Sequence, residues 1–202
     1  MKMAPGALSL INALNGASEK LGLPKVKDAE IRSLNCKRYF QAVGRALATG
    51  GATSPGGELG EELTNPNLMA NDIVMRLRAN ASGQWQEIDG KDDWEVWERV
   101  QALANQGALV VGASTGTPNG HLAVVSPIPP TLKVSDFEGK GPFVRDGNEH
   151  FIQGRVYAST WGAVEASKAF DTRRHPPTWH VWAPSLGKSG LPEARGLELM
   201  LP

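Results

Sequence analysis

The chain has 202 residues, with 21 Lys and Arg balanced by 21 Asp and Glu, so its formal net charge is zero. A chain of this length buries a sizeable core as one domain and needs no disulfide or structural metal for its stability. The balanced charge, with no long run of Lys or Arg, disfavours nucleic acid and anionic membranes as partners. One cysteine excludes an internal disulfide and any multi-cysteine zinc site. We therefore expect no metal and no cofactor, and no apolar run reaches the roughly 18 residues of a membrane span.

The first half of the chain is predicted to be mostly helical. Apolar spacing and end signals predict helices over residues 7–21, 35–48, 65–78 and 93–106, with Asn65 and Asp93 as caps. Gly107 is the predicted stop of the last of these helices. Residues 49–60, rich in Gly, Ser and Pro, read as a loop.

Short apolar or alternating runs predict strands in the second half, with one short helix at 163–170. The strand candidates are residues 84–88, 108–113, 121–125, 151–158 and 178–182. Helices followed by strands predict an α+β domain with an antiparallel sheet. We expect one domain over 1–202, with a helical extension at 1–30 and a surface tail at 184–202. A weak apolar stretch near the N-terminus does not make a clear signal peptide.

Cys36 draws attention because it is the one cysteine and lies at the predicted start of a helix. Asn35 is a good N-cap, and Cys36, Phe40, Val43 and Leu47 recur at a spacing that places the sulfur on the core-facing stripe. Unpaired N–H groups and the positive end of the helix dipole favour a thiolate there, and the thiolate is the nucleophile. The competing interpretation is a lone buried cysteine that acts as a small hydrophobe.

A catalytic cysteine needs a base, and four histidines are candidates. His121 opens a buried-looking strand directly after Gly120, whose missing side chain leaves room for a substrate backbone. A histidine there can accept the thiol proton and later protonate a leaving amine, or it is simply a strand end in water. His180 lies between tryptophans, which favours packing. His150 and His175 read as loop residues.

The order of these features resembles papain-like cysteine peptidases and, more narrowly, the type VI secretion amidase effectors of family 1, which are bacterial toxins that cut peptidoglycan peptides. The resemblance covers about residues 33–127. Its matching pieces are Asn35-Cys36, residues 40–43, residues 70–77, Trp85, residues 104–111 and residues 120–125.

The resemblance implies an α+β, papain-like fold and an endopeptidase that cuts the amide between γ-D-glutamate and meso-diaminopimelate. Cys36 would attack the carbonyl, His121 would act as base and acid, and the Cys36 backbone N–H would help hold the oxyanion. The group that orients His121 would come from the next strand, as Ser159, Thr160 or the Ala158 backbone carbonyl. No third residue stands out.

The resemblance also implies a protein made in the cytoplasm, loaded onto a type VI secretion apparatus and active in the periplasm of a neighbouring cell. A cognate immunity protein would plug its groove. The loops 49–60 and 114–119, Trp161, and the charges of Lys37 and Arg38 are candidate substrate contacts or ordinary solvated surface. Other cysteine-histidine acyl chemistry on the same fold, as in a phage-type lysin, a protein deamidase or a transglutaminase, remains an alternative. So does a non-catalytic binding domain with a core cysteine.

Overall fold

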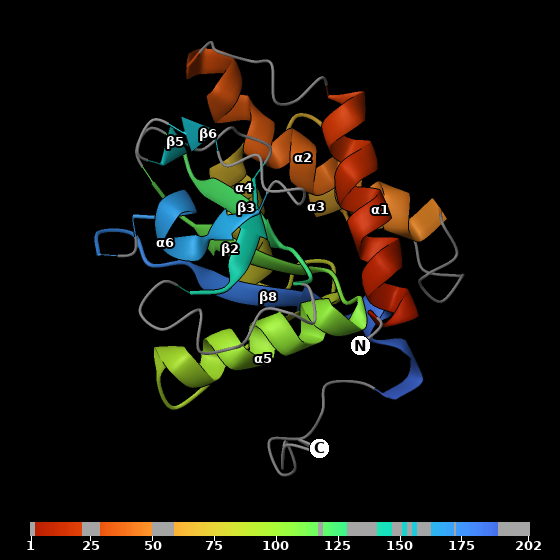
Figure 1. The fold of residues 1–202 in the computed structure, drawn as a ribbon. Coiled ribbons are helices and arrows are strands. Elements are labelled where there is room, and N and C mark those ends of the chain that lie inside the picture. The colour runs from red at the N-terminus through yellow and green to blue at the C-terminus, as the bar shows by residue number, and fades with distance from the viewer. Residues whose placement is uncertain are drawn as a thin grey trace.

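The protein combines helices with an antiparallel sheet and belongs to the α+β class, as predicted. The computed structural model describes residues 3–21, 29–49, 59–116, 119–128, 141–146, 151–152, 155–156, 163–171 and 173–189. In Figure 1 the helices α1 and α2 lie side by side at one side of the sheet, and α5 runs along its lower end.

Helix α1, Pro5–Lys20, begins with proline in its first turn and is part of the core. It buries Ala7, Leu10, Ala13, Leu14 and Ala17 and packs against α2 and α5. The described part of the predicted 1–30 extension is therefore integral to the domain. Among the described helices, none is both long and apolar enough to cross a membrane.

Helix α2, Ala29–Thr49, begins six residues earlier than the sequence suggested. The prediction that Asn35 caps this helix is therefore wrong. Residues 29–34 contain neither Gly nor Pro, and Ala, Glu, Arg and Leu are good helix formers, so nothing local stops the helix from extending.

Two short helices follow, α3 at Glu61–Thr64 and α4 at Ala70–Arg78. Asn65 is the C-cap of α3 and not the N-cap of the next helix, so that prediction is wrong too. The N-terminus of α4 is instead closed by Asp72, whose carboxylate accepts the Met69 N–H at 2.8 Å.

Helix α5, Asp93–Gln106, has the predicted bounds, although its cap is Asp92. The Asp92 carboxylate accepts the Glu95 N–H at 2.9 Å. Gly107 ends the helix in the left-handed conformation with φ 101°, as predicted.

Six strands form the main sheet of the described residues in the order β1-β8-β2-β3-β4-β7, with every neighbouring pair antiparallel. Their bounds are Trp85–Glu87 for β1, Thr178–Trp182 for β8, Val110–Ser114 for β2, His121–Val125 for β3, Phe143–Arg145 for β4 and Val164–Glu165 for β7. The strands β3 and β8 match their predicted bounds. Strand β4 was not expected, and it pairs with the strand that carries His121.

The remaining elements are small. Strands β5, Phe151–Ile152, and β6, Arg155–Val156, pair with each other where one strand was predicted over 151–158. Helix α6, Ala166–Ala169, follows β7. The 3-10 helix η2, Ala183–Ser189, begins the predicted surface tail, of which residues 190–202 lie outside the described part.

The core fills the space between helices and sheet and includes nearly every residue of the central strands. The helices α2 and α4 contact β3, and α5 contacts β2 and β3. Phe40 of α2 packs on Trp85 of β1 with ring centroids 5.6 Å apart. Because α2 contacts β3, His121, the first residue of β3, lies next to the helix that carries Cys36.

Candidate active site

Cys36 lies on the core side of α2, and its residue is 2 % exposed. Phe40, Val43 and Leu47 are buried with it, so the predicted core stripe is confirmed. Because α2 begins at Ala29, however, Cys36 lies in the helix interior, beyond the first turn in which the helix dipole acts.

The interior position also affects the oxyanion role expected for the Cys36 N–H. In a continuous α-helix, the carbonyl four residues earlier accepts each interior N–H. The Cys36 N–H is thus used by the helix, and the reason for assigning it to an oxyanion is lost. Activation of the sulfur has to come from neighbouring side chains.

His121 is the first residue of β3, and the loop before it is fastened to α4 through Asn71. The Asn71 amide donates to the Gly116 carbonyl at 3.0 Å, and its oxygen accepts the Gly116 N–H at 3.2 Å. A Cβ on Gly120 would lie 2.5 Å from the Asn71 oxygen and 2.9 Å from the Ser114 carbonyl. The space beside Gly120 is therefore filled by the protein, contrary to the expected opening for a substrate backbone.

The structure brings His121 together with Cys36 and with a residue that sequence reasoning missed, Asp146. The His121 Nε2 lies 3.0 Å from the Asp146 Oδ2, and the Cys36 side chain is the other hydrogen-bonding neighbour of the imidazole. The Asp146 side chain is 1 % exposed and that of His121 27 %. An imidazole between a thiol and a buried carboxylate is the arrangement of a nucleophile, a base and an orienting group.

These neighbours keep His121 cationic. Burial alone lowers the pKa of His121, but hydrogen bonding to Asp146 and Cys36, together with their negative charges, outweighs it and raises the pKa to about 10. At neutral pH the site therefore holds an imidazolium beside the sulfur.

Aromatic packing fixes the imidazole from another side. The Phe170 ring, directly after α6, meets the His121 ring edge to face with centroids 5.1 Å apart, and Trp179 meets Phe170 at 6.0 Å. A Cβ on Gly112 would lie 3.0 Å from Phe170 and 2.7 Å from Trp179. Glycine on β2 thus makes room for the aromatic pair that packs against His121.

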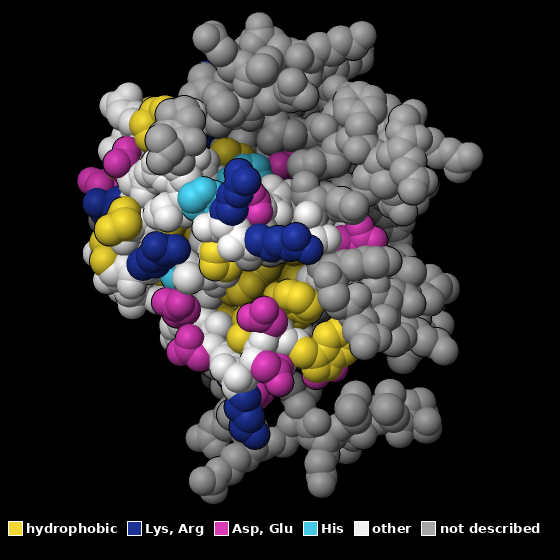
Figure 2. All heavy atoms as spheres, turned by 90° about the vertical axis from the view of Figure 1, so that its left-hand side faces the viewer, with side chains coloured by type: hydrophobic (Ala, Val, Ile, Leu, Met, Phe, Trp, Pro, Cys, Tyr) yellow, Lys and Arg dark blue, Asp and Glu magenta, His cyan; other side chains and the backbone are white. Residues whose placement is uncertain are grey.

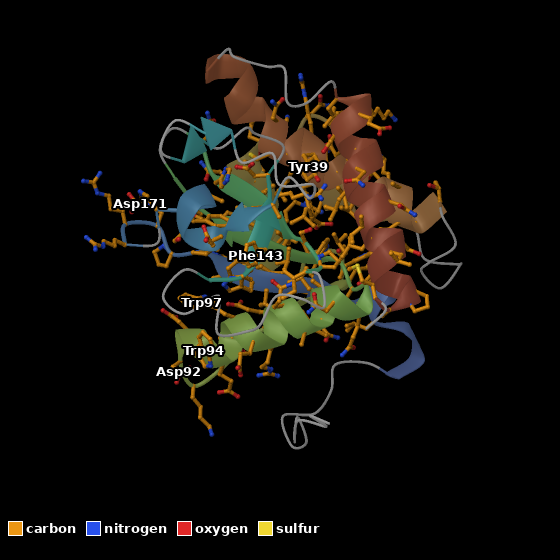
Figure 3. The ribbon with its side chains drawn as sticks, viewed as in Figure 1. Tyr39, Asp92, Trp94, Trp97, Phe143 and Asp171 are labelled. Carbon is orange, nitrogen blue, oxygen red and sulfur yellow. The ribbon has the colours of Figure 1, made fainter. Side chains whose placement is uncertain are left out.

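A buried polar cluster lies behind Asp146. The Arg145 guanidinium donates to the Asn15 side-chain oxygen at 2.8 Å, and the Tyr39 hydroxyl donates to the Leu14 carbonyl at 3.1 Å. Burial raises the pKa of Tyr39, while Arg145 opposes that rise and Asp146 adds to it. Figure 3 shows Tyr39 where α2 meets α1. The cluster ties the end of β4, and with it Asp146, to both helices.

The three candidates for the orienting group, Ala158, Ser159 and Thr160, lie outside the described residues. Asp146 was not among the site residues expected from the sequence, in which the nearby His150 read as a loop residue. Strand β4 ends one residue before this acid and pairs with β3, and this pairing brings Asp146 to His121. His150 and Trp161 also lie outside the described part.

Other candidates have structural roles. The Lys37 ammonium donates to the carbonyls of Pro66 and Leu68, each at 3.0 Å, so it is not available to a substrate carboxylate. His180 is fully buried, as expected from its tryptophan neighbours, and its Nε2 lies 2.9 Å from the Thr178 hydroxyl. His175 lies in an exposed turn.

Across the residues that the structure describes, no group of three or more His, Cys, Asp or Glu side chains could hold a metal ion. No protein-family model matches the chain, and no curated protein matches it either. The groups that this site offers for chemistry are the Cys36 side chain, the His121 imidazole beside it and the Asp146 carboxylate that holds the imidazole.

Proposed function

We propose that the protein is a papain-like cysteine hydrolase that cuts an amide bond with Cys36, His121 and Asp146. The observation that carries the proposal is the position of the His121 imidazole, which contacts the Cys36 side chain and lies 3.0 Å from the Asp146 carboxylate. A core cysteine does not need a histidine beside it, nor does a strand-end histidine need a buried acid. Their combination supports a catalytic role over the hydrophobe interpretation.

In the proposed reaction the Cys36 thiolate attacks the amide carbonyl carbon, and the carbonyl oxygen becomes an oxyanion. The His121 imidazolium then gives its proton to the amide nitrogen as the C–N bond breaks, which releases an amine and leaves a thioester. The neutral imidazole next takes a proton from water, the hydroxyl attacks the thioester, and the carboxylic acid leaves as the thiolate and imidazolium re-form. Asp146 stays ionised and keeps the imidazole oriented throughout.

The oxyanion needs a donor other than the Cys36 N–H. The Asn35 side chain belongs to a residue that is 4 % exposed, and its Nδ2 has no hydrogen-bond partner among the described residues. A buried N–H group without a partner is costly, which favours a role with a substrate.

The substrate part of the proposal comes from the resemblance to type VI secretion amidase effectors. We propose that the bond is the amide between γ-D-glutamate and meso-diaminopimelate in the peptidoglycan stem peptide. The protein would act in the periplasm of a neighbouring cell after type VI secretion, and a cognate immunity protein would block its groove. The cysteine on a helix and the histidine at the start of a strand support this family over unrelated acyl-transfer folds.

The test is mass spectrometry of purified peptidoglycan and of isolated stem peptides after incubation with the protein. We expect fragments that end in γ-D-glutamate with the wild type, none with Cys36→Ala or His121→Ala, and unchanged cleavage with the matched control His175→Ala. Cleavage that survives Cys36→Ala would refute the cysteine mechanism. No cleavage by a folded wild type whose Cys36 still reacts rapidly with iodoacetamide would refute the substrate and leave the mechanism intact.

A further inference from the structure

A second site candidate lies away from the catalytic cluster, in a pocket of about 230 Å³. It lies between the first turns of α5, the residues after β1, the start of α6 and the start of β8. None of Cys36, His121 and Asp146 lines it. Figure 2 shows apolar side chains gathered in a hollow on this face, with acidic side chains below it and Lys or Arg side chains above it.

The floor of this pocket is apolar and aromatic. Trp97 and Trp179 line it together with Ile88, Val96 and two prolines of the segment before β8. Figure 3 shows Trp97 on the side of α5 that faces the sheet and α6. Gly141, with φ 79°, packs behind it, since a Cβ there would lie 3.6 Å from the Trp97 ring. Trp97 is partly buried and packs against the hydrophobic core.

The charge of the lining has one sign. Three carboxylates line the pocket, those of Glu87, Asp89 and Asp93, and no Lys, Arg or His side chain does. None of the ion pairs formed among the described residues involves these three. The nearby Arg99 donates to the Asp89 backbone carbonyl and not to its carboxylate. Such a rim attracts a cation and repels a carboxylate or phosphate.

We propose that this pocket binds a primary ammonium carried on an aliphatic chain, such as a lysine-type side chain of a peptide. The chain contacts the apolar floor, while the ammonium reaches the carboxylates and the face of an indole, where a cation is attracted by the ring quadrupole. The volume is below the roughly 300 Å³ at which pockets for drug-sized ligands begin, so it suits one side chain and not a whole peptide. This proposal is independent of the hydrolase activity.

The test uses Nα-acetyl-lysine methylamide and its uncharged analogue Nα-acetyl-norleucine methylamide as probes. Indole N–H signals are followed by NMR, with the Trp97 signal assigned through Trp97→Phe. We expect a saturable shift of that signal with the lysine probe and binding at least several-fold weaker with the norleucine probe. In the double variant Glu87→Gln, Asp89→Asn the lysine affinity should fall about three- to tenfold, because each exposed ion pair contributes modestly.

Glu98→Gln is the matched control, because Glu98 is exposed on the same helix outside the pocket. It should leave the affinity for the lysine probe unchanged, and circular dichroism checks that every variant is folded. Equal binding of the two probes would show an apolar pocket without ammonium selectivity and would overturn the proposal. So would an equal loss in Glu98→Gln, or no saturable shift up to roughly 50 mM probe.

Discussion

Replacing Asp146 by Asn removes the negative charge that faces His121 at 3.0 Å while keeping the size of the side chain. An opposite charge at such a distance typically moves a pKa by about one to three units. The pKa of His121, held at about 10 in the wild type, should therefore fall by about one to three units in Asp146→Asn. In this variant burial still lowers the pKa of His121, and of the two neighbours that raise it only Cys36 remains.

The assay is an NMR titration of the histidine ring protons from pH 5 to 11. Asp171→Asn is the matched control, since Asp171 is an exposed acid near Arg174. The alkaline limb of the hydrolysis rate should move with the titration of His121.

The pH dependence of the free energy of unfolding is a second test of the raised His121 pKa. Because the folded pKa of His121 is raised from 6.5 to about 10, its stabilising contribution is complete below about pH 6.5 and is lost as pH rises through about 10. In Asp146→Asn this loss should end at a lower pH. A His121 titration that moves by less than about half a unit would refute the role given to Asp146.

Three further predictions concern the surroundings of the site. Burial and Arg78 lower the pKa of His180 from 6.5 to about 4. Between pH 6.5 and 4 the wild type should therefore lose about 3 kcal/mol more unfolding free energy than His180→Gln, measured by urea unfolding. Equal losses in the two proteins would contradict this prediction. Gly120→Ala should cost about 1–3 kcal/mol because its Cβ would lie 2.5 Å from an amide oxygen, whereas Gly16→Ala, with nothing within 4 Å, should be neutral or stabilising. If the proposed mechanism holds, Phe170→Leu should lower kcat about tenfold with KM nearly unchanged, because the His121 imidazole loses its ring contact at 5.1 Å; a change confined to KM would argue against a positioning role.

Local signals in the sequence were enough to predict several elements correctly. The short apolar run His121–Val125, which Ser126-Pro127 stops, and the segment Thr178–Trp182 predicted both strands with their observed bounds. The helix Asp93–Gln106 was bounded by an acidic cap region and by Gly107, signals that act within one turn. The sequence also singled out Cys36 and His121, the one cysteine and a histidine that opens a strand, and the structure brings them together.

What sequence reasoning missed depends on contacts between distant residues. Strand β4 has three residues, too few for a readable period, and it exists through pairing with β3. Asp146 follows that strand, so its place beside His121 could not be found from local pattern. The start of α2 was misplaced because a good N-cap residue, Asn35, lies inside a helix that nothing interrupts.

The central claim is that Cys36, although 2 % exposed, is an activated nucleophile, and its alkylation rate tests this most directly. Iodoacetamide is applied at pH 6 to the native protein, to the same protein unfolded in urea, and to His121→Ala, with the adduct counted by mass spectrometry. The account predicts that native Cys36 reacts faster than the unfolded chain, whose thiol is protonated at this pH, and that His121→Ala abolishes the difference. A native cysteine that reacts more slowly than the unfolded one would identify it as a core residue and contradict the account.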